Sequence, residues 1–300
     1  MKTKVSQCEL IVNIRYAKVC DYAYAYNIHN GEKNKIETLI CTNIFEDIKN
    51  DTRNYISIYS KLDYLPNLLN NIKNIDKKFI LVTGCSDAPI KKNMLPFIPN
   101  NIVKWYAENV EVQNSLVVSL PMGSISGTWI GNNIIDCEWN THPKCKLINT
   151  TNDEPKIKNL VFMCFSIETN APHRREVYDY FKNKSWTTNL CKENTGKYLE
   201  DELFMKNIYN HYFTISPFGN GIDCGRTWSI LQMGGIPIIP YHYAFEKWAE
   251  NLPILLYHNL NEITEEYLNI KLKEFSSKKY NYDYLKTSYW KSIFEQNKLN

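Results

Sequence analysis

The most constraining feature of this 300-residue sequence is a glycine-rich loop with an apolar run on either side. Tyr212–Ser216 (YFTIS) and Ile236–Ile239 (IPII) both have the composition of buried strands. Between them lie a loop with three glycines, Pro217–Gly225, and a predicted short helix, Arg226–Met233. The glycine pair 234–235 ends that helix, because glycine adopts the left-handed conformation of a C-terminal cap without steric cost. The order strand, loop, helix, strand predicts a parallel sheet covered by helices.

The first half of the chain repeats this alternation more loosely. Phe79–Thr83 is an apolar run that ends at a glycine, and it predicts a buried strand. Ile102–Tyr106 and Leu116–Leu120 predict two further strands. Upstream, Tyr64–Ile75 places its leucines and isoleucines at helical spacing. Strands that alternate with helices again favour a parallel sheet with both faces covered.

A polar segment separates the two halves. Residues 140–159 contain two prolines and have no hydrophobic periodicity, as is typical of a linker or its surface flank. Leu160–Phe165 then begins a new buried strand, and helices are predicted over 172–181 and 198–211. We therefore predict an α/β fold of two domains. The predicted limits are 1–145 for the first domain, 155–275 for the second and 280–300 for a C-terminal helix.

Composition excludes several classes of protein. The formal charge is +3, from 35 basic and 32 acidic residues, which is too balanced to indicate a nucleic-acid partner. No run approaches the roughly 20 apolar residues of a membrane span, and the N-terminal residues lack the apolar stretch of a signal peptide. Nine cysteines without a C-x-x-C pair favour neither a disulfide framework nor a zinc ribbon, and Cys137, His142 and Cys145 are expected to be loop or core residues. We expect a globular cytoplasmic protein.

The glycine-rich loop is the strongest candidate for a binding site. It leaves the carboxyl end of a predicted parallel strand, where open α/β sheets bind ligands, and its glycines let backbone N–H groups approach an anion. Arg226 adds a bidentate donor for phosphate oxygens, and Asp223 is placed to cap the helix or to accept from a ligand hydroxyl. A tight structural turn is the alternative, with Asp223 as the N-cap and Arg226 paired to a surface carboxylate.

Other phosphate and hydrolase motifs do not occur. The sequence has no G-x-x-x-x-G-K-[ST] and no G-x-S-x-G, so neither a P-loop NTPase nor an α/β-hydrolase is indicated. It also has no D-x-D, the usual means of holding a metal on a nucleotide diphosphate. We therefore expect a nucleotide sugar to be bound without a metal, and no other cofactor.

These residues resemble a known family. Ser216–Trp228 (SPFGNGIDCGRTW), followed by Gly234–Ile238 (GGIPI), resembles the C-terminal motif of exostosin-like glycosyltransferases, S-P-R-G-N-G-x-D-x-x-R-x-W-E-A-L and then G-C-I-P. Thr83–Asp87 is similar to that family's strand-ending N-S-D element. Lys104–Asn109 and Leu120–Gly123 are similar to its W-[FY]-A-x-N element and the P-x-G turn that follows. The resemblance covers about residues 60 to 260, in the same order.

The resemblance implies a GT-B architecture, in which two Rossmann-like domains face each other across a cleft. It implies a nucleotide-sugar donor on the C-terminal domain and a glycan or other hydroxyl acceptor on the N-terminal one. The activity implied is transfer of a sugar from that donor to that acceptor. The expected donor-binding residues are Ser216, Pro217, Gly219, Asn220, Gly221, Asp223, Arg226, Ser229 and Arg174.

Three positions depart from the family pattern. Ser229 stands where the family has a glutamate, whose carboxylate is expected to bind the ribose hydroxyls of the donor. Phe218 replaces an arginine beside the phosphates. Gly235 replaces a cysteine. A catalytically inactive nucleotide- or sugar-binding relative is therefore the alternative function. Another GT-B enzyme, such as a fucosyltransferase or a sugar-phosphate enzyme, is a third.

Glycosyl transfer also needs a base for the acceptor hydroxyl. Asp87 is the first candidate, because it follows the predicted strand Phe79–Thr83, and an Asx-turn or helix N-cap is its alternative role. Glu108 is the second candidate, with a solvated loop position as its alternative. Arg174 and Arg175 begin a predicted helix, where at least one is expected on an exposed basic face.

Histidines and tryptophans are weaker candidates. His142, His173 and His211 are expected to be surface residues or histidines with satisfied hydrogen bonds. Trp105, Trp129 and Trp139 are large enough to stack on a sugar ring, but we expect them in the core.

Overall fold

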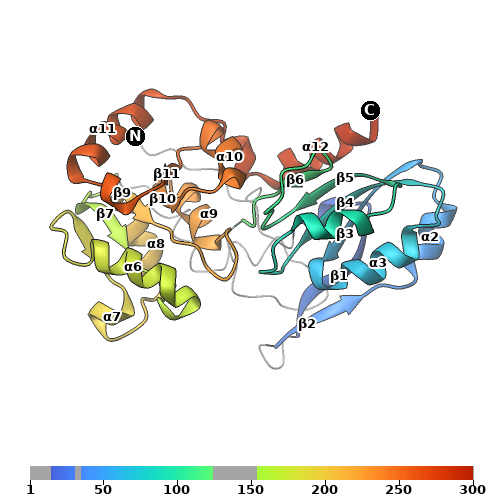
Figure 1. Ribbon diagram of the computed structural model, residues 1–300, viewed down its shortest axis with the longest axis horizontal. Helices are drawn as coiled ribbons and strands as arrows, with labels where there is room; N and C mark the ends of the chain where they lie inside the picture. Colours follow the sequence, from blue (N-terminus) through green and yellow to red (C-terminus); the bar gives the residue numbers. More distant parts are fainter. Residues whose placement is uncertain (1–14, 31–34, 124–153, 300) are drawn as a thin grey trace. The chain divides into compact units, whose positions relative to one another are not determined.

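The computed structural model describes residues 15–30, 35–123 and 154–299. The chain divides into two compact units. We call the described residues 15–123 and 286–299 the N-unit and residues 154–285 the C-unit. Each unit is a Rossmann-like α/β layer structure built on a mostly parallel sheet, which confirms the predicted fold class (Figure 1).

The sheet of the C-unit has five parallel strands in the order β11-β10-β9-β7-β8. The strands are β7 (Asn159–Met163), β8 (Thr187–Asn189), β9 (His211–Ile215), β10 (Ile236–Pro240) and β11 (Leu255–Tyr257). The chain begins in the interior with β7 and steps outward to β8. It then returns to the other side of β7 and continues through β9, β10 and β11. The winding direction therefore reverses between β7 and β9, and such switch points are where open α/β sheets bind ligands.

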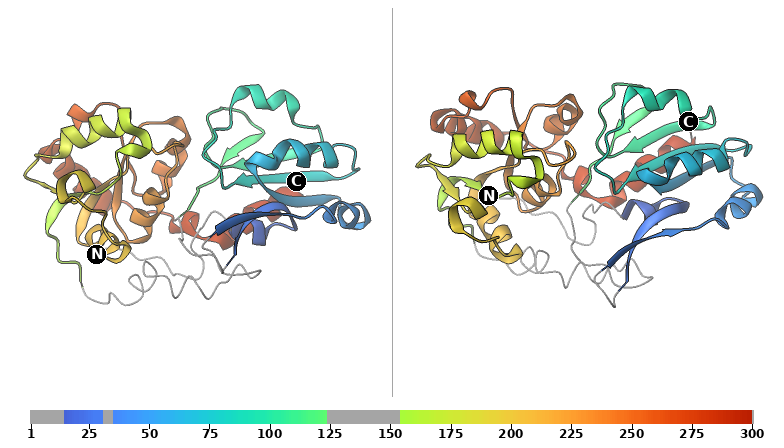
Figure 2. Two further views of the ribbon diagram at one scale, coloured as in Figure 1. Left: turned by 90° about the horizontal axis from the view of Figure 1, so that it is seen from below. Right: turned by 60° about the horizontal axis from the view of Figure 1, so that its bottom comes forward.

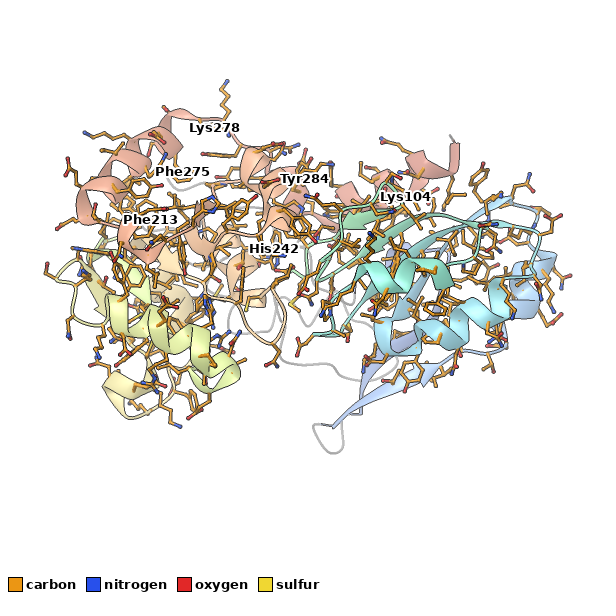
Figure 3. The ribbon with its side chains drawn as sticks, viewed as in Figure 1. Lys104, Phe213, His242, Phe275, Lys278 and Tyr284 are labelled. Carbon is orange, nitrogen blue, oxygen red and sulfur yellow. The ribbon has the colours of Figure 1, made fainter. Side chains whose placement is uncertain are left out.

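Helices cover both faces of this sheet. On one face α6 (Ala171–Phe181) and α11 (Glu265–Ser277) pack on alternate strand residues such as Val161 and Phe213, and Figure 3 shows Phe213 inside the unit. On the other face Phe162 contacts Phe204 of α8 (Asp201–Tyr209). Beside α8 lies α9 (Gly225–Gln232), and an edge contact between Trp228 and Trp248 joins α9 to α10 (Glu246–Asn251). The short helix α7 (Lys192–Thr195) follows β8.

The end of α9 has the glycine cap that the sequence predicts. Gly234 has φ +71°, and its N–H donates to the carbonyl of Leu231 at 3.0 Å. The N–H of Gly235 donates to the carbonyl of Ile230 at 2.9 Å, which completes a Schellman motif. A Cβ at Gly235 would lie 3.0 Å from Cγ2 of Ile230, so a side chain there would crowd the helix.

The sheet of the N-unit has the order β2-β1-β3-β4-β5-β6. The strands are β1 (Tyr22–Asn30), β2 (Lys35–Ile40), β3 (Tyr55–Lys61), β4 (Lys78–Gly84), β5 (Ile102–Ala107) and β6 (Val117–Ser119). Only the pairing of β2 with β1 is antiparallel among the described strands. From β1 to β6 the parallel strands follow one another across the sheet in chain order.

This strand order leaves one face of the N-unit's sheet without crossover helices. Right-handed crossovers that all advance in one direction put their helices on the same side, here α2 (Ile44–Asn50) and α3 (Leu65–Ile72). The opposite face is covered by α1 (Arg15–Val19) and by α12 (Thr287–Leu299) from the end of the chain (Figure 2). The C-terminal helix thus completes the core of the N-unit.

Phe294 anchors α12 on this face. Its ring is fully buried, 4.9 Å from the ring of Tyr106 and 6.4 Å from that of Tyr16. Near the helix end, Nζ of Lys298 lies 2.7 Å from Oδ2 of Asp21. No helix in the described part of the chain combines the length and the apolarity needed to cross a membrane.

We expect Phe294→Ala to lower the free energy of unfolding of the N-unit by about 3–5 kcal/mol, because it leaves a cavity between α12 and the sheet. The neighbouring side chain of Glu295 is exposed, so Glu295→Ala is a matched control with little expected effect. Urea unfolding followed by tryptophan fluorescence measures both. Equal midpoints for the two variants would show that α12 does not stabilise the unit.

Candidate anion-binding site

Two loops and two helix N-termini meet at the switch point of the C-unit. Residues 164–170 connect β7 to α6, and residues 216–224 connect β9 to α9. Because β7 and β9 are neighbours, both loops leave the same edge of the sheet, and the two helices then run over opposite faces. Helix N-termini carry unpaired N–H groups and partial positive charge, so this edge favours an anion.

Arg174 joins the two loops. Its Nη1 donates to the carbonyl of Ser166 at 2.6 Å, and its Nε donates to the carbonyl of Phe218 at 2.7 Å. Only 3% of the residue is exposed. Arg175, which follows it on α6, is exposed, so the prediction that at least one of these two arginines lies on an exposed face is confirmed.

Arg226 lies beside it, in the first turn of α9. Its Cζ is 5.7 Å from the ring centroid of Phe165, and Cζ of Arg174 is 5.9 Å from the same ring. Nη1 of Arg226 is buried and has no hydrogen-bond acceptor among the described residues. Within the described ranges no carboxylate forms an ion pair with either arginine, so these residues do not support the alternative in which Arg226 pairs with a surface carboxylate.

The two guanidinium groups repel one another. Burial, followed by the charge of Arg226, lowers the pKa of Arg174 to about 10. Arg174 still carries its charge near neutral pH, so two positive charges share this edge without a described counter-charge. A buried donor left without an acceptor costs about 1–3 kcal/mol. An anion between the helix N-termini would remove both penalties, which makes this the candidate anion-binding site.

Gly219 has a steric role in the loop. A Cβ there would lie 3.2 Å from Sγ of Cys224 and 3.3 Å from Nη2 of Arg174, so a side chain would displace one of these groups by a few tenths of an ångström. Its N–H donates to the carbonyl of Gly221 at 3.0 Å, and its own carbonyl accepts from Nδ2 of Asn170 at 2.8 Å. The expectation that the amide of Gly219 faces a phosphate is therefore wrong, because the loop itself uses it.

The other predicted loop residues differ in exposure. Ser216 is buried, with its Oγ 2.9 Å from Oγ1 of Thr227 on α9. Pro217 is buried too, and its carbonyl accepts from Sγ of Cys224 at 3.7 Å. Asn220 is exposed at the tip of the loop. Ser216 and Pro217 thus hold the loop, and Asn220 is open to solvent.

Asp223 and Ser229 are turned toward α9. Oδ1 of Asp223 accepts from the N–H of Cys224 and from Nε1 of Trp228, both at 2.7 Å. The N-cap residue is Cys224, so the interpretation of Asp223 as the N-cap is wrong. Oγ of Ser229 donates to the carbonyl of Gly225 at 3.1 Å, and only 3% of the residue is exposed. These contacts fix the start of α9.

Phe218 is the centre of an aromatic cluster beside the arginines. Its ring centroid lies 5.6 Å from that of His173, 6.3 Å from that of Phe245 and 6.4 Å from that of His242, which Figure 3 labels. Nε2 of His173 is buried and has no partner among the described residues, so the expectation of a surface or satisfied histidine is wrong there. The expectation is right for His211, which is fully buried and has contacts at both ring nitrogens.

The two candidate bases follow adjacent strands of the N-unit. Asp87 is exposed in the loop after β4. Glu108 follows β5 directly and is only 3% exposed, so the alternative of a solvated loop position is wrong for it. Its Oε2 accepts from the N–H of Cys85 at 3.0 Å. Cys85 and Asn109 have φ values of +56° and +51°, a strained conformation for residues other than glycine.

Cys85 is not a nucleophile. Burial, and then the charge of Glu108, raises the pKa of its thiol to about 12, which keeps the thiol protonated near neutral pH. Trp105 is fully buried and its Nε1 donates to Oγ1 of Thr83, as expected of a core residue. The predicted residues Trp129, Trp139, Cys137, His142 and Cys145 lie outside the described ranges.

The chain matches no protein-family model and no curated protein. It is similar to solved structures of an alpha1,3-fucosyltransferase, at 14% identity over 85% of this chain and 84% of the other, with a TM-score of 0.45. The same enzyme type with GDP-fucose gives 12% identity over 86% and 84%, with a TM-score of 0.43. An alpha,alpha-trehalose 6-phosphate synthase from Burkholderia multivorans gives 7% identity over 86% and 73%, with a TM-score of 0.44. A functional argument therefore depends on this chain's own residues.

The two arginines should respond differently to replacement. We expect Arg174→Met to lower the free energy of unfolding by about 2–4 kcal/mol, because the carbonyls of Ser166 and Phe218 lose their donor. Arg226→Met should leave the free energy of unfolding unchanged or raise it, because methionine keeps an apolar stem and removes the charge that repels Arg174. Urea unfolding in a buffer free of phosphate and nucleotide measures both. Equal destabilisation by the two changes would make Arg226 a structural residue.

Proposed function

We propose that this chain is a glycosyltransferase that moves a sugar from a nucleotide-sugar donor to a hydroxyl acceptor. The single observation that carries the proposal is Nη1 of Arg226, a buried donor without a described acceptor beside the second guanidinium of Arg174. A diphosphate matches this arrangement, because it carries two negative groups and bidentate acceptor oxygens. The motif over 216–228 supports the proposal through its resemblance to exostosin-like glycosyltransferases.

The same groups would assist the chemical step. Breaking the bond between sugar and diphosphate leaves negative charge on the diphosphate, and fixed positive groups stabilise that charge in the transition state. Arg226 is free to contact the phosphate directly, whereas Arg174 contributes its charge while its donors hold the loops. Since these groups already supply two positive charges, we propose that transfer needs no metal ion.

The departures at Phe218 and Ser229 define the alternative function. Ser229 bonds to its own helix and Phe218 packs among aromatic rings, so neither supplies the carboxylate or the cation of the family pattern. A relative that binds a nucleotide sugar without transferring the sugar would keep the arginines and lose these groups. Binding combined with no turnover on a broad acceptor panel would favour this alternative.

Ligand binding tests the donor site. We expect one of UDP, GDP, CMP or dTDP, or its sugar conjugate, to raise the unfolding temperature, since a ligand at a hundred times its Kd stabilises the native state by about 2.7 kcal/mol. The shift should persist in EDTA. Arg226→Met should weaken binding by about 10- to 100-fold through loss of a charge-assisted contact, and Arg175→Met is the control because Arg175 is exposed on α6. No shift with any nucleotide would contradict the proposal.

We propose Asp87 as the acceptor base, because it is exposed in the loop after β4, whereas Glu108 is only 3% exposed and its Oε2 accepts from the N–H of Cys85. We expect Asp87→Asn to lower turnover by about 10²- to 10⁴-fold without changing donor affinity. Glu108→Gln keeps an oxygen acceptor for Cys85 and tests the second candidate. Both variants are measured by sugar transfer and by calorimetry with the donor. Normal turnover in Asp87→Asn, with loss in Glu108→Gln, would move the role to Glu108.

A further inference from the structure

The imidazole of His173 has a position that the proposed transfer does not use. It is the third residue of α6, in the turn that opens at the switch point. Its ring packs against that of Phe218 in a tilted arrangement, with 5.6 Å between centroids and 30° between planes. Arg174, the next residue, donates to the carbonyl of that same Phe218. The ring therefore lies on the loop that receives the buried guanidinium, with Nε2 buried and unpartnered within the described structure.

The charged and titratable groups around this ring are few. Its own helix contributes Glu176 and Arg174. The loop after β9 contributes the uncharged ring of Phe218, and the segment after β10 contributes His242 at the edge of Phe218, with Nδ1 accepting from the N–H of Ala244. Burial, assisted by the charge of Arg174 and opposed by that of Glu176, lowers the pKa of His173. Without a ligand the imidazole is therefore neutral near neutral pH.

We propose that His173 is a third ligand of the anion held by Arg226 and Arg174, and that it takes up one proton from solvent when the anion binds. The imidazole becomes an imidazolium whose Nε2–H donates to a phosphate oxygen. The identification of the anion as the donor's diphosphate rests on the proposed function, but the proton uptake does not depend on the nucleotide.

The physical reason is the charge already present. A permanently charged third group would add repulsion to two arginines whose charges already oppose each other. A histidine adds its charge only when the anion is there to stabilise it. Because binding raises the pKa of His173, anion affinity is greatest at low pH and falls as the pH rises through the bound-state pKa. Each unit by which binding raises that pKa changes the affinity tenfold between the low- and high-pH limits.

Calorimetry with pyrophosphate tests this proposal, using the full chain from about pH 5.5 to about pH 8.5. Runs in buffers of different ionisation heat count the protons taken up. We expect the wild type to take up more protons than His173→Gln when pyrophosphate binds near neutral pH. As the pH is lowered, its affinity for pyrophosphate should rise by about 10- to 100-fold more than that of His173→Gln. His173→Gln keeps a neutral donor and should bind at an intermediate level, whereas His173→Phe should bind most weakly. His258→Gln changes an exposed histidine and should match the wild type.

The outcomes separate the two proposals. The same pH profile and proton count in the wild type and in both His173 variants would overturn the role of His173, even if a nucleotide sugar binds. The ionisation of pyrophosphate itself is common to every variant, so it cancels in that comparison. Pyrophosphate binding with the expected pH dependence, but without any nucleotide binding, would support His173 and contradict the proposed function. No pyrophosphate binding at any pH would overturn the anion site and His173 together.

Discussion

The C-unit is organised around two guanidinium groups on one phenylalanine ring. Arg174 and Arg226 come from helices on opposite faces of the sheet, and both approach Phe165, which follows β7. The two like charges repel each other, as the lowered pKa of Arg174 reflects, and this repulsion destabilises the fold. Arg174 is held there by the carbonyls of Ser166 and Phe218, which do not neutralise its charge, and Arg226 lies over the ring of Phe165. An arrangement that costs stability when empty is expected at a functional site.

The sheet topology makes this arrangement possible. Only where the winding direction reverses do loops from two neighbouring strands leave toward opposite faces, and β7 and β9 are such a pair. The N-unit has no reversal among its described parallel strands, so its crossover helices lie on one face and α12 has to cover the other. The same rule of right-handed crossovers thus produces the candidate anion site in one unit and a dependence on the end of the chain in the other.

Local patterns predicted much of the fold and only part of the site. The strand, loop, helix and cap around Gly234 are set within about 25 residues, so the sequence predicts them. It did not predict the hairpin of β1 with β2, the edge strands β8 and β11, or the docking of Phe294, because short strands and long-range contacts leave little local pattern. The burial of Arg174 was missed for the same reason: its acceptors lie 8 and 44 residues away.

Phe218 connects the departures from the family pattern to the charge of the site. A third permanent cation at this position would lie beside two arginines that already repel each other, and phenylalanine removes that repulsion. The ring instead packs against His173, which we propose to be charged only when the anion is bound. Two permanent charges, on Arg174 and Arg226, and one conditional charge, on His173, repel each other less than three permanent charges would. In the proposed function, phenylalanine at position 218 therefore makes the third charge conditional, and the donor site does not require a permanent cation there.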